Sequence, residues 1–148
     1  MNNNDIHKNK YEQTPIKHIN SITNPFIKDI PRLRNKLNLA VFASGNGSNF
    51  EAISRAISDN YLNAEISVLI ANNKNCNAIN RAKKLGIEFR LIDHRKYTSR
   101  ESHELEILKV LGEYHIEAII MAGWMRIVTS KLIDAYPGKI INIHPSLL

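Results

Sequence analysis

The spacing of apolar positions changes repeatedly along the chain from residue 38 onward. Short, continuous apolar runs indicate strands, and apolar residues three or four positions apart indicate helices. The predicted strands cover residues 39–43, 66–70, 87–92, 116–122 and 139–143. The predicted helices cover residues 49–60, 76–85, 99–114 and 129–136. Strands and helices therefore alternate along this part of the chain.

The predicted strands, such as Leu39–Ala43 and Ile66–Ile70, are apolar throughout rather than at every second position. A strand of this kind is covered on both faces, and alternation with helices favours parallel pairing. We therefore expect an α/β fold of three layers, with a mostly parallel, Rossmann-like sheet and helices on both faces. Ligands of such sheets bind beyond the carboxyl ends of the strands.

Residues 1–37 differ from the rest of the chain. Their apolar positions follow no sustained helical or strand periodicity, and they contain three Pro among scattered charges. We expect a disordered N-terminal extension here, followed by one α/β domain over residues 38–148. Three acidic residues, Asp5, Glu12 and Asp29, argue against a transit peptide.

Composition excludes several classes of protein. No apolar run approaches the roughly 20 residues of a membrane span, and the single cysteine, Cys76, fits a reducing compartment. A cytoplasmic protein without a membrane partner is expected. Residues 1–37 hold seven Lys and Arg against three Asp and Glu, and residues 38–148 hold thirteen against eleven. The net charge of +6 is thus concentrated outside the domain, so nucleic acid is not an expected partner.

The segment Ser44–Asn49 (SGNGSN) is a Gly-rich turn between a predicted strand and a predicted helix. Free N–H groups at a helix N-terminus attract anions such as phosphate. The dinucleotide fingerprint fails, because Phe50 occupies the position of its third glycine. A single phosphate is therefore the better hypothesis, and a tight turn without a ligand is the alternative.

The segment Met121–Val128 follows the fourth predicted strand and is apolar and aromatic, which is unusual for a loop. Its backbone could pair with a flat heterocycle, with Trp124, Met125 and Ile127 as the walls of a pocket. Alternatively, these side chains pack against the next helix, and Arg126 forms a salt bridge.

Asn142 and His144 lie two positions apart in the last predicted strand, so both side chains project to the same side. An amide donor and an imidazole suit the oxyanion and the proton of an acyl transfer. No Ser or Cys nucleophile is evident nearby, which favours direct transfer between two bound substrates. A structural, hydrogen-bonded His is the alternative.

Three motifs together resemble the phosphoribosylglycinamide formyltransferase family. They are Ser44–Asn49 (SGNGSN), Ala122–Ile127 (AGWMRI) and Ile141–Leu148 (INIHPSLL), in the same order and with similar spacing. The resemblance covers residues 38–148. It implies transfer of a formyl group from 10-formyltetrahydrofolate to the amine of 5′-phosphoribosylglycinamide in purine synthesis, without a metal.

The resemblance also implies roles for single residues. Gly47, Ser48 and Asn49 would hold the substrate phosphate. Asn142 would hold the formyl oxygen of the folate, and His144 would be the catalytic acid and base.

For the folate, the resemblance implies a pocket lined by Met125, Arg126, Ile127 and Val128. Arg100 would lie at the acidic tail of the folate.

The family continues beyond INIHPSLL with further strands and an aspartate that pairs with the histidine. We therefore expect a C-terminally incomplete domain and poor activity of the 148-residue chain. Three alternatives remain: a methionyl-tRNA formyltransferase relative, a formyltetrahydrofolate deformylase, and a non-catalytic remnant. Pro145 and the Gly-rich segment favour the glycinamide enzyme over the first two. The oligomeric state is not predicted.

Overall fold

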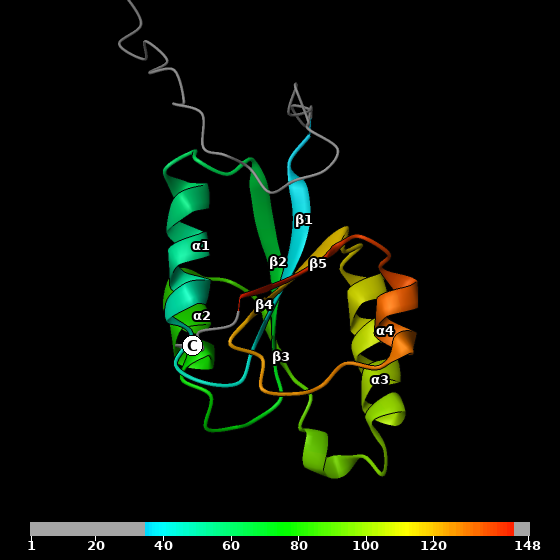
Figure 1. Ribbon diagram of the computed structural model, residues 1–148. Helices are drawn as coiled ribbons and strands as arrows, with labels where there is room; N and C mark the ends of the chain where they lie inside the picture. The colour runs from blue at the N-terminus through cyan, green and yellow to red at the C-terminus, as the bar shows by residue number, and fades with distance from the viewer. Residues whose placement is uncertain (1–34, 144–148) are drawn as a thin grey trace, which may run out of the picture. The chain divides into compact units, whose positions relative to one another are not determined.

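In a computed structural model that describes residues 35–143, five parallel strands form a central sheet (Figure 1). In chain order the elements are β1 (Leu37–Ala43), α1 (Ser48–Ser58), β2 (Ala64–Ala71), α2 (Ala78–Leu85), β3 (Phe89–Leu91), the 3-10 helix η1 (His94–Lys96), α3 (Arg100–Glu113), β4 (Ala118–Ala122), α4 (Ser130–Ala135) and β5 (Ile140–Ile143). The strand order is β3-β2-β1-β4-β5, and all neighbouring pairs are parallel. The expected parallel α/β fold is therefore confirmed.

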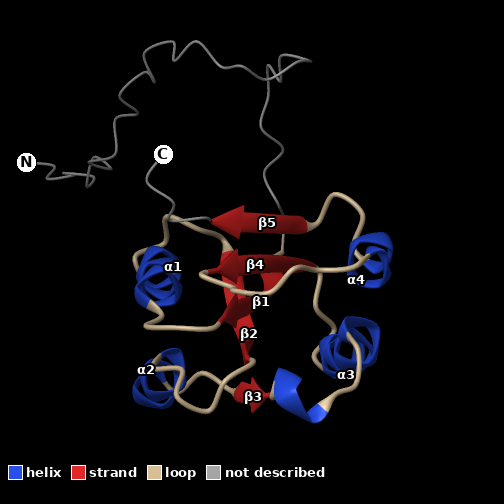
Figure 2. Cartoon of the chain, turned by 60° about the horizontal axis from the view of Figure 1, so that its bottom comes forward, coloured by secondary structure: helices blue, strands red, loops and turns tan. Residues whose placement is uncertain are grey.

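The two faces of the sheet hold separate apolar clusters, because neighbouring residues of a strand point to opposite faces. In β1, Phe42 belongs to the cluster with Leu111 of α3 and Leu132 of α4. Val41 belongs to the cluster with Phe50 of α1. Figure 2 shows α1 and α2 on one side of the sheet and α3 and α4 on the other. The sheet with its two apolar faces is therefore the middle of three layers, with helices on each side.

Capping residues determine where α3 begins and where α2 ends, close to the predicted positions. The Oγ of Ser99 accepts a hydrogen bond from the Ser102 N–H at 3.0 Å and caps the start of α3. Helix α2 ends at Gly86, which has a φ of 67°, a conformation that favours glycine. Among residues 35–143, no helix has the length and apolar character required to cross a membrane.

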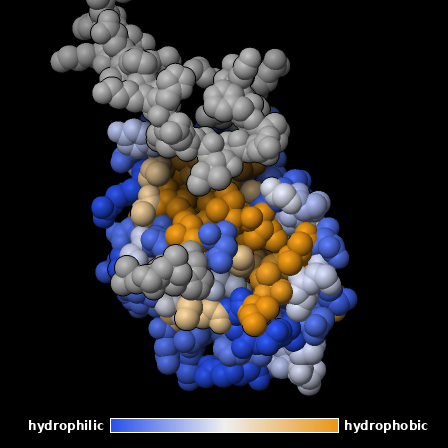
Figure 3. All heavy atoms as spheres, in the orientation of Figure 1, coloured by the Kyte–Doolittle hydropathy of each residue, from blue (hydrophilic) through white to orange (hydrophobic). Residues whose placement is uncertain are grey.

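Strand β5 forms one edge of the sheet and carries exposed apolar side chains. Ile141 is 61% exposed and Ile143 is 37% exposed. Figure 3 shows the apolar surface on the face of the molecule that is turned to the viewer. Two predictions fall outside the described residues: residues 1–34 of the expected extension, and His144 with the four residues after it.

Candidate functional site

The Gly-rich loop (residues 44–49) runs from the end of β1 into the first turn of α1. Gly47 has a φ of 76°, and a Cβ atom added to it would lie 2.5 Å from the Cβ of Ala78. Gly47 is also the N-cap of α1, and no side chain caps this helix. Ser48 is exposed and Asn49 is half-buried. The first turn therefore presents backbone donors and the positive end of the helix dipole to an anion.

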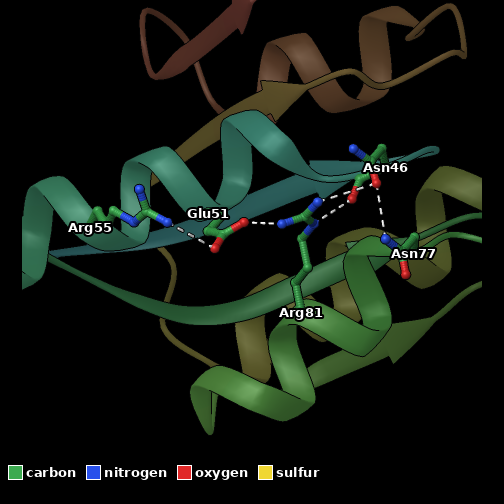
Figure 4. A network of polar contacts seen from close by, with 5 residues as sticks. All are labelled: Asn46, Glu51, Arg55, Asn77 and Arg81. Atoms are coloured by element: carbon green, nitrogen blue, oxygen red, sulfur yellow. Dashed lines mark hydrogen bonds and ion pairs between the residues drawn. The ribbon is translucent and has the colours of Figure 1, made fainter.

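A polar network fixes this loop against α2 (Figure 4). The Nε of Arg81 donates to the backbone oxygen of Asn46 at 2.8 Å, and Asn77 Nδ2 donates to the Asn46 side-chain oxygen at 2.9 Å. Arg81 also forms an ion pair with Glu51, which in turn lies 3.3 Å from Arg55. Glu51 offsets the charge of Arg81, so the anion would be held mainly by the backbone of the loop.

Cys76 contributes to the same contact rather than to chemistry. The Gly45 carbonyl accepts hydrogen bonds from the Cys76 thiol and from the Ala78 N–H, both at 3.2 Å. Cys76 is only 2% exposed, and burial raises the pKa of its thiol. A protonated, buried thiol is a poor nucleophile.

Trp124 was predicted to form a wall of a pocket, and it lines the small cavity next to the apolar segment after β4. It is 8% exposed and packs between the rings of Phe42, at 5.0 Å, and His103, at 6.2 Å. Trp124 also belongs to the apolar cluster that includes Leu132 of the following helix, so the two interpretations of this residue do not exclude each other. Met125 and Ile127 are 76% and 70% exposed and remain open to a ligand.

Ser44 joins the Gly-rich loop to the apolar loop, defined here as Met125–Val128. Its N–H donates to the Gly123 carbonyl at 3.1 Å, and its Oγ accepts from the Met125 N–H at 2.8 Å. The N–H groups of residues 126–128 have no hydrogen-bond partner within the described part of the chain. These three consecutive backbone donors are available to a polar ligand bound on this part of the surface.

The structure brings together most of the residues predicted to contact the folate. A small cavity between α3 and the apolar loop is lined by four of them, Arg100, Arg126, Ile127 and Val128, and also by His103, Glu104, Ile107, Trp124 and Leu132. Asn142 is exposed on β5, where it pairs in register with Met121 of β4. The position of His144 relative to Asn142 lies beyond the described residues.

The sequence reasoning missed two histidines close to this cavity. The Nε2 of His103 donates to the Ile92 carbonyl at 2.8 Å, and the Nδ1 of His94 donates to the Asn72 carbonyl at 2.9 Å. His103 is 4% exposed, and burial lowers the pKa of its imidazole below the usual 6.5. No pattern in the sequence marks His103, because it occupies an ordinary helical position. Over residues 35–143, no cluster of three or more metal-ligating side chains is present.

The buried imidazole of His103 is expected to make stability depend on pH. The unfolded imidazole binds a proton below about pH 6.5, whereas the folded one stays neutral because its pKa is lowered. The stabilisation is therefore complete above that pH. It is lost as the pH falls toward the lower folded pKa, with a slope of at most about 1.4 kcal/mol per pH unit.

Urea denaturation of the wild type and of His103→Gln between pH 5 and pH 8 measures this contribution. The free energy of unfolding of the wild type minus that of His103→Gln should become smaller as the pH falls. Arg126, His94 and Glu104 also act electrostatically on His103, and they are present in both proteins. A constant difference over this range would contradict the expected titration of His103.

The family model described as "Formyl transferase" matches residues 37–148. A phosphoribosylglycinamide formyltransferase of Bacillus subtilis is 40% identical over 109 residues, which are 74% of this chain and 56% of that protein. The trifunctional purine biosynthetic protein adenosine-3 of Gallus gallus is 39% identical over 114 residues, 77% of this chain and 11% of that protein.

Solved structures give the same result. The glycinamide ribonucleotide transformylase 1 of Geobacillus kaustophilus matches with a TM-score of 0.73 and 39% identity. The match covers 77% of this chain and 61% of that structure. The chain therefore spans less than two thirds of the length of these relatives.

Proposed function

Because the chain belongs to the formyl transferase family, we propose that it acts in the transfer of a formyl group from 10-formyltetrahydrofolate to the amine of 5′-phosphoribosylglycinamide. This reaction is a step of purine synthesis, and the names of similar proteins support it. The proposed substrates are small molecules, and the proposed location is the cytoplasm.

The observation that carries this proposal is the hydrogen bond between Ser44 and Met125. It joins a loop suited to a phosphate to a loop with free backbone donors, across the carboxyl ends of β1 and β4. A transfer without a covalent intermediate needs two substrate sites next to each other. The two loops supply neighbouring sites of different chemistry.

On the nucleotide side, the proposed phosphate ligands are Gly47, Ser48 and Asn49. The uncapped start of α1 supports this assignment, because its N–H groups are not used by a side chain of the protein. The Arg81 network supports it further by holding Asn46, the residue before Gly47, in place.

On the folate side, the proposed contacts are Met125, Arg126, Ile127 and Val128, with Arg100 toward the acidic tail. The exposed Met125 and Ile127 side chains could cover the faces of a flat ring, while the neighbouring N–H groups bind its polar edge. Arg100 begins α3 and lies on the same cavity, which supports its assignment to the tail.

In the proposed reaction, the amine of the nucleotide attacks the formyl carbon of the folate. The Asn142 amide donates to the formyl oxygen as negative charge develops on it. His144 takes the proton from the attacking amine and returns it to the folate nitrogen that leaves. Direct attack is favoured because Cys76, the one cysteine of the chain, is buried and protonated.

Titration calorimetry tests the nucleotide site first. The chain is expected to bind phosphoribosylglycinamide about tenfold to a hundredfold more tightly than the same compound without its phosphate. Hydrogen bonds to a charged group are worth roughly 1.5–3 kcal/mol, which corresponds to this ratio. Equal affinities for the two compounds would refute the phosphate assignment.

Formyl transfer is then followed with both substrates present and the protein in excess over the folate. Formation of the formylated nucleotide supports the proposed reaction. Folate cleavage without formylated nucleotide would instead identify a hydrolase. Binding of the nucleotide with neither product would identify a non-catalytic remnant.

A further inference from the structure

Glu104 of α3 holds the end of the apolar loop through two hydrogen bonds. The N–H of Thr129 donates to Glu104 Oε1 at 2.7 Å, and the Thr129 hydroxyl donates to Glu104 Oε2. Thr129 directly follows the apolar loop and is the N-cap of α4. One residue of α3 therefore fixes the point at which the loop enters the next helix.

This arrangement places a carboxylate in a costly environment. Glu104 is 3% exposed, and none of the ion pairs found among residues 35–143 includes it. Its neighbour His103 is buried with a lowered pKa and supplies no positive charge near pH 7. Burial of an unpaired carboxylate is unfavourable unless hydrogen bonds offset it. The hydrogen bonds that offset it here are those from Thr129.

The consequence for the apolar loop is that both of its ends are held from outside. Ser44 accepts from Met125 at the start, and Glu104 accepts from Thr129 at the end. Residues 126–128 lie between these anchors without internal backbone hydrogen bonds. A loop with free N–H groups keeps one conformation when its ends are fixed, and this lowers the entropic cost of binding.

We propose that Glu104 is a positioning residue that holds the apolar loop in the conformation that receives the flat ring of the folate. Glu104 also lines the cavity beside the apolar loop, and its positioning role acts through Thr129. The inference rests on the proposed function for the identity of the ligand. The geometry itself, a buried carboxylate clamping one end of an otherwise unpaired loop, does not depend on that function.

Glu104→Gln tests the inference, because glutamine keeps the size of the side chain but replaces one acceptor by a donor. One of the two Thr129 donors then loses its acceptor. We expect the dissociation constant for 10-formyltetrahydrofolate to rise at least about tenfold. The dissociation constant for phosphoribosylglycinamide should stay within about twofold of the wild type. Thr129→Ser, which retains both donors, should behave like the wild type.

Val110→Ala is the matched control for general destabilisation. Val110 is a buried residue of the same helix, lies about 1.7 turns beyond Glu104 and is not among the residues that line the small cavity. Its truncation should lower the melting temperature without a selective loss of folate affinity. The inference is refuted if Glu104→Gln leaves folate affinity unchanged, or if Val110→Ala produces the same selective loss.

A second measurement separates failure of this inference from failure of the proposed function. Backbone relaxation by NMR of the free protein should show ordered amides at residues 126–128 in the wild type and order parameters below about 0.6 in Glu104→Gln. The amides of α1 should not change. A wild type that binds no folate refutes the proposed ligand only. A loop that stays ordered in Glu104→Gln refutes the positioning role.

Discussion

Replacement of Gly47 by Val is expected to lower the free energy of unfolding by about 2–5 kcal/mol and to weaken nucleotide binding at least about tenfold. The φ of 76° costs a residue with a Cβ roughly 1–2 kcal/mol. The added atom would also lie 2.5 Å from Ala78 Cβ and 2.7 Å from Ala78 Cα. Overpacking of this kind costs about 1–3 kcal/mol. Since Ala78 lies in α2, the loop must move away from the helix.

This movement of the loop is expected to change both the free energy of unfolding and the affinity for the nucleotide. The loop can relieve the contact only by shifting the first turn of α1, where the N–H groups of Ser48 and Asn49 would meet the phosphate. Urea denaturation measures the first effect, and calorimetry with phosphoribosylglycinamide measures the second at a temperature where the variant is folded.

Gly45→Ala is the matched control for Gly47→Val. A Cβ on Gly45 would meet no atom within 4 Å, and Gly45 does not have a positive φ. Its substitution should change the free energy of unfolding by no more than about 0.5 kcal/mol. If Gly47→Val is as mild as this control, then Gly47 is not conformationally required. If Gly47→Val is destabilised but binds nucleotide normally, then the phosphate lies elsewhere.

The strands were predictable because this sheet is buried on both faces. The buried part of an interior strand, such as Leu39–Ala43 of β1, is apolar at every position, and a run of this kind is visible without structural information. Strand β3 shows the limit of this reasoning. Residues 87–92 were predicted, and the structure assigns only Phe89–Leu91, because this edge strand pairs with β2 alone through three residue pairs. Apolar character predicts burial, but the length of a strand depends on its partner.

The candidate site was predictable only where its residues are consecutive. The Gly-rich loop and the apolar loop each form one short segment, and both lie at the edge of the sheet that the topology implied. Their supports were missed. Arg81 reaches Asn46 from 35 positions away, and Glu104 reaches Thr129 from 25 positions away. In the sequence, Arg81 and Glu104 are indistinguishable from the charged residues of any solvent-exposed helix. Their hydrogen-bond partners, Asn46 and Thr129, depend on how the helices pack.

The sequence did not reveal that Trp124 has two roles. An aromatic residue in a loop at the ligand edge predicts a wall of a pocket as readily as a core residue. Trp124 lines the small cavity, and its ring also packs between Phe42 of the adjacent β1 and His103 of α3. The exposed Met125 next to it shows that one position along the loop separates core from surface.

In a chain extended to the full length of its relatives, His144→Ala is expected to lower the rate of formyl transfer about a hundredfold to ten-thousandfold, the usual contribution of a general acid and base. Affinity for both substrates should stay within about threefold, because the imidazole would act on a proton that moves only during the reaction. Single-turnover kinetics with the protein in excess measures the rate even where the wild type is slow. Added imidazole should restore part of the rate, since it supplies the missing acid and base from solution.

His115→Asn controls for the loss of an imidazole elsewhere. His115 is exposed with a φ of 50°, and asparagine tolerates that conformation. This variant should transfer the formyl group at the wild-type rate. If His144→Ala raises the Michaelis constant without lowering the rate, then His144 acts in substrate binding. Its proposed role as the acid and base would then be refuted. A fall in rate that imidazole cannot restore, together with a lower melting temperature, would make His144 a structural residue.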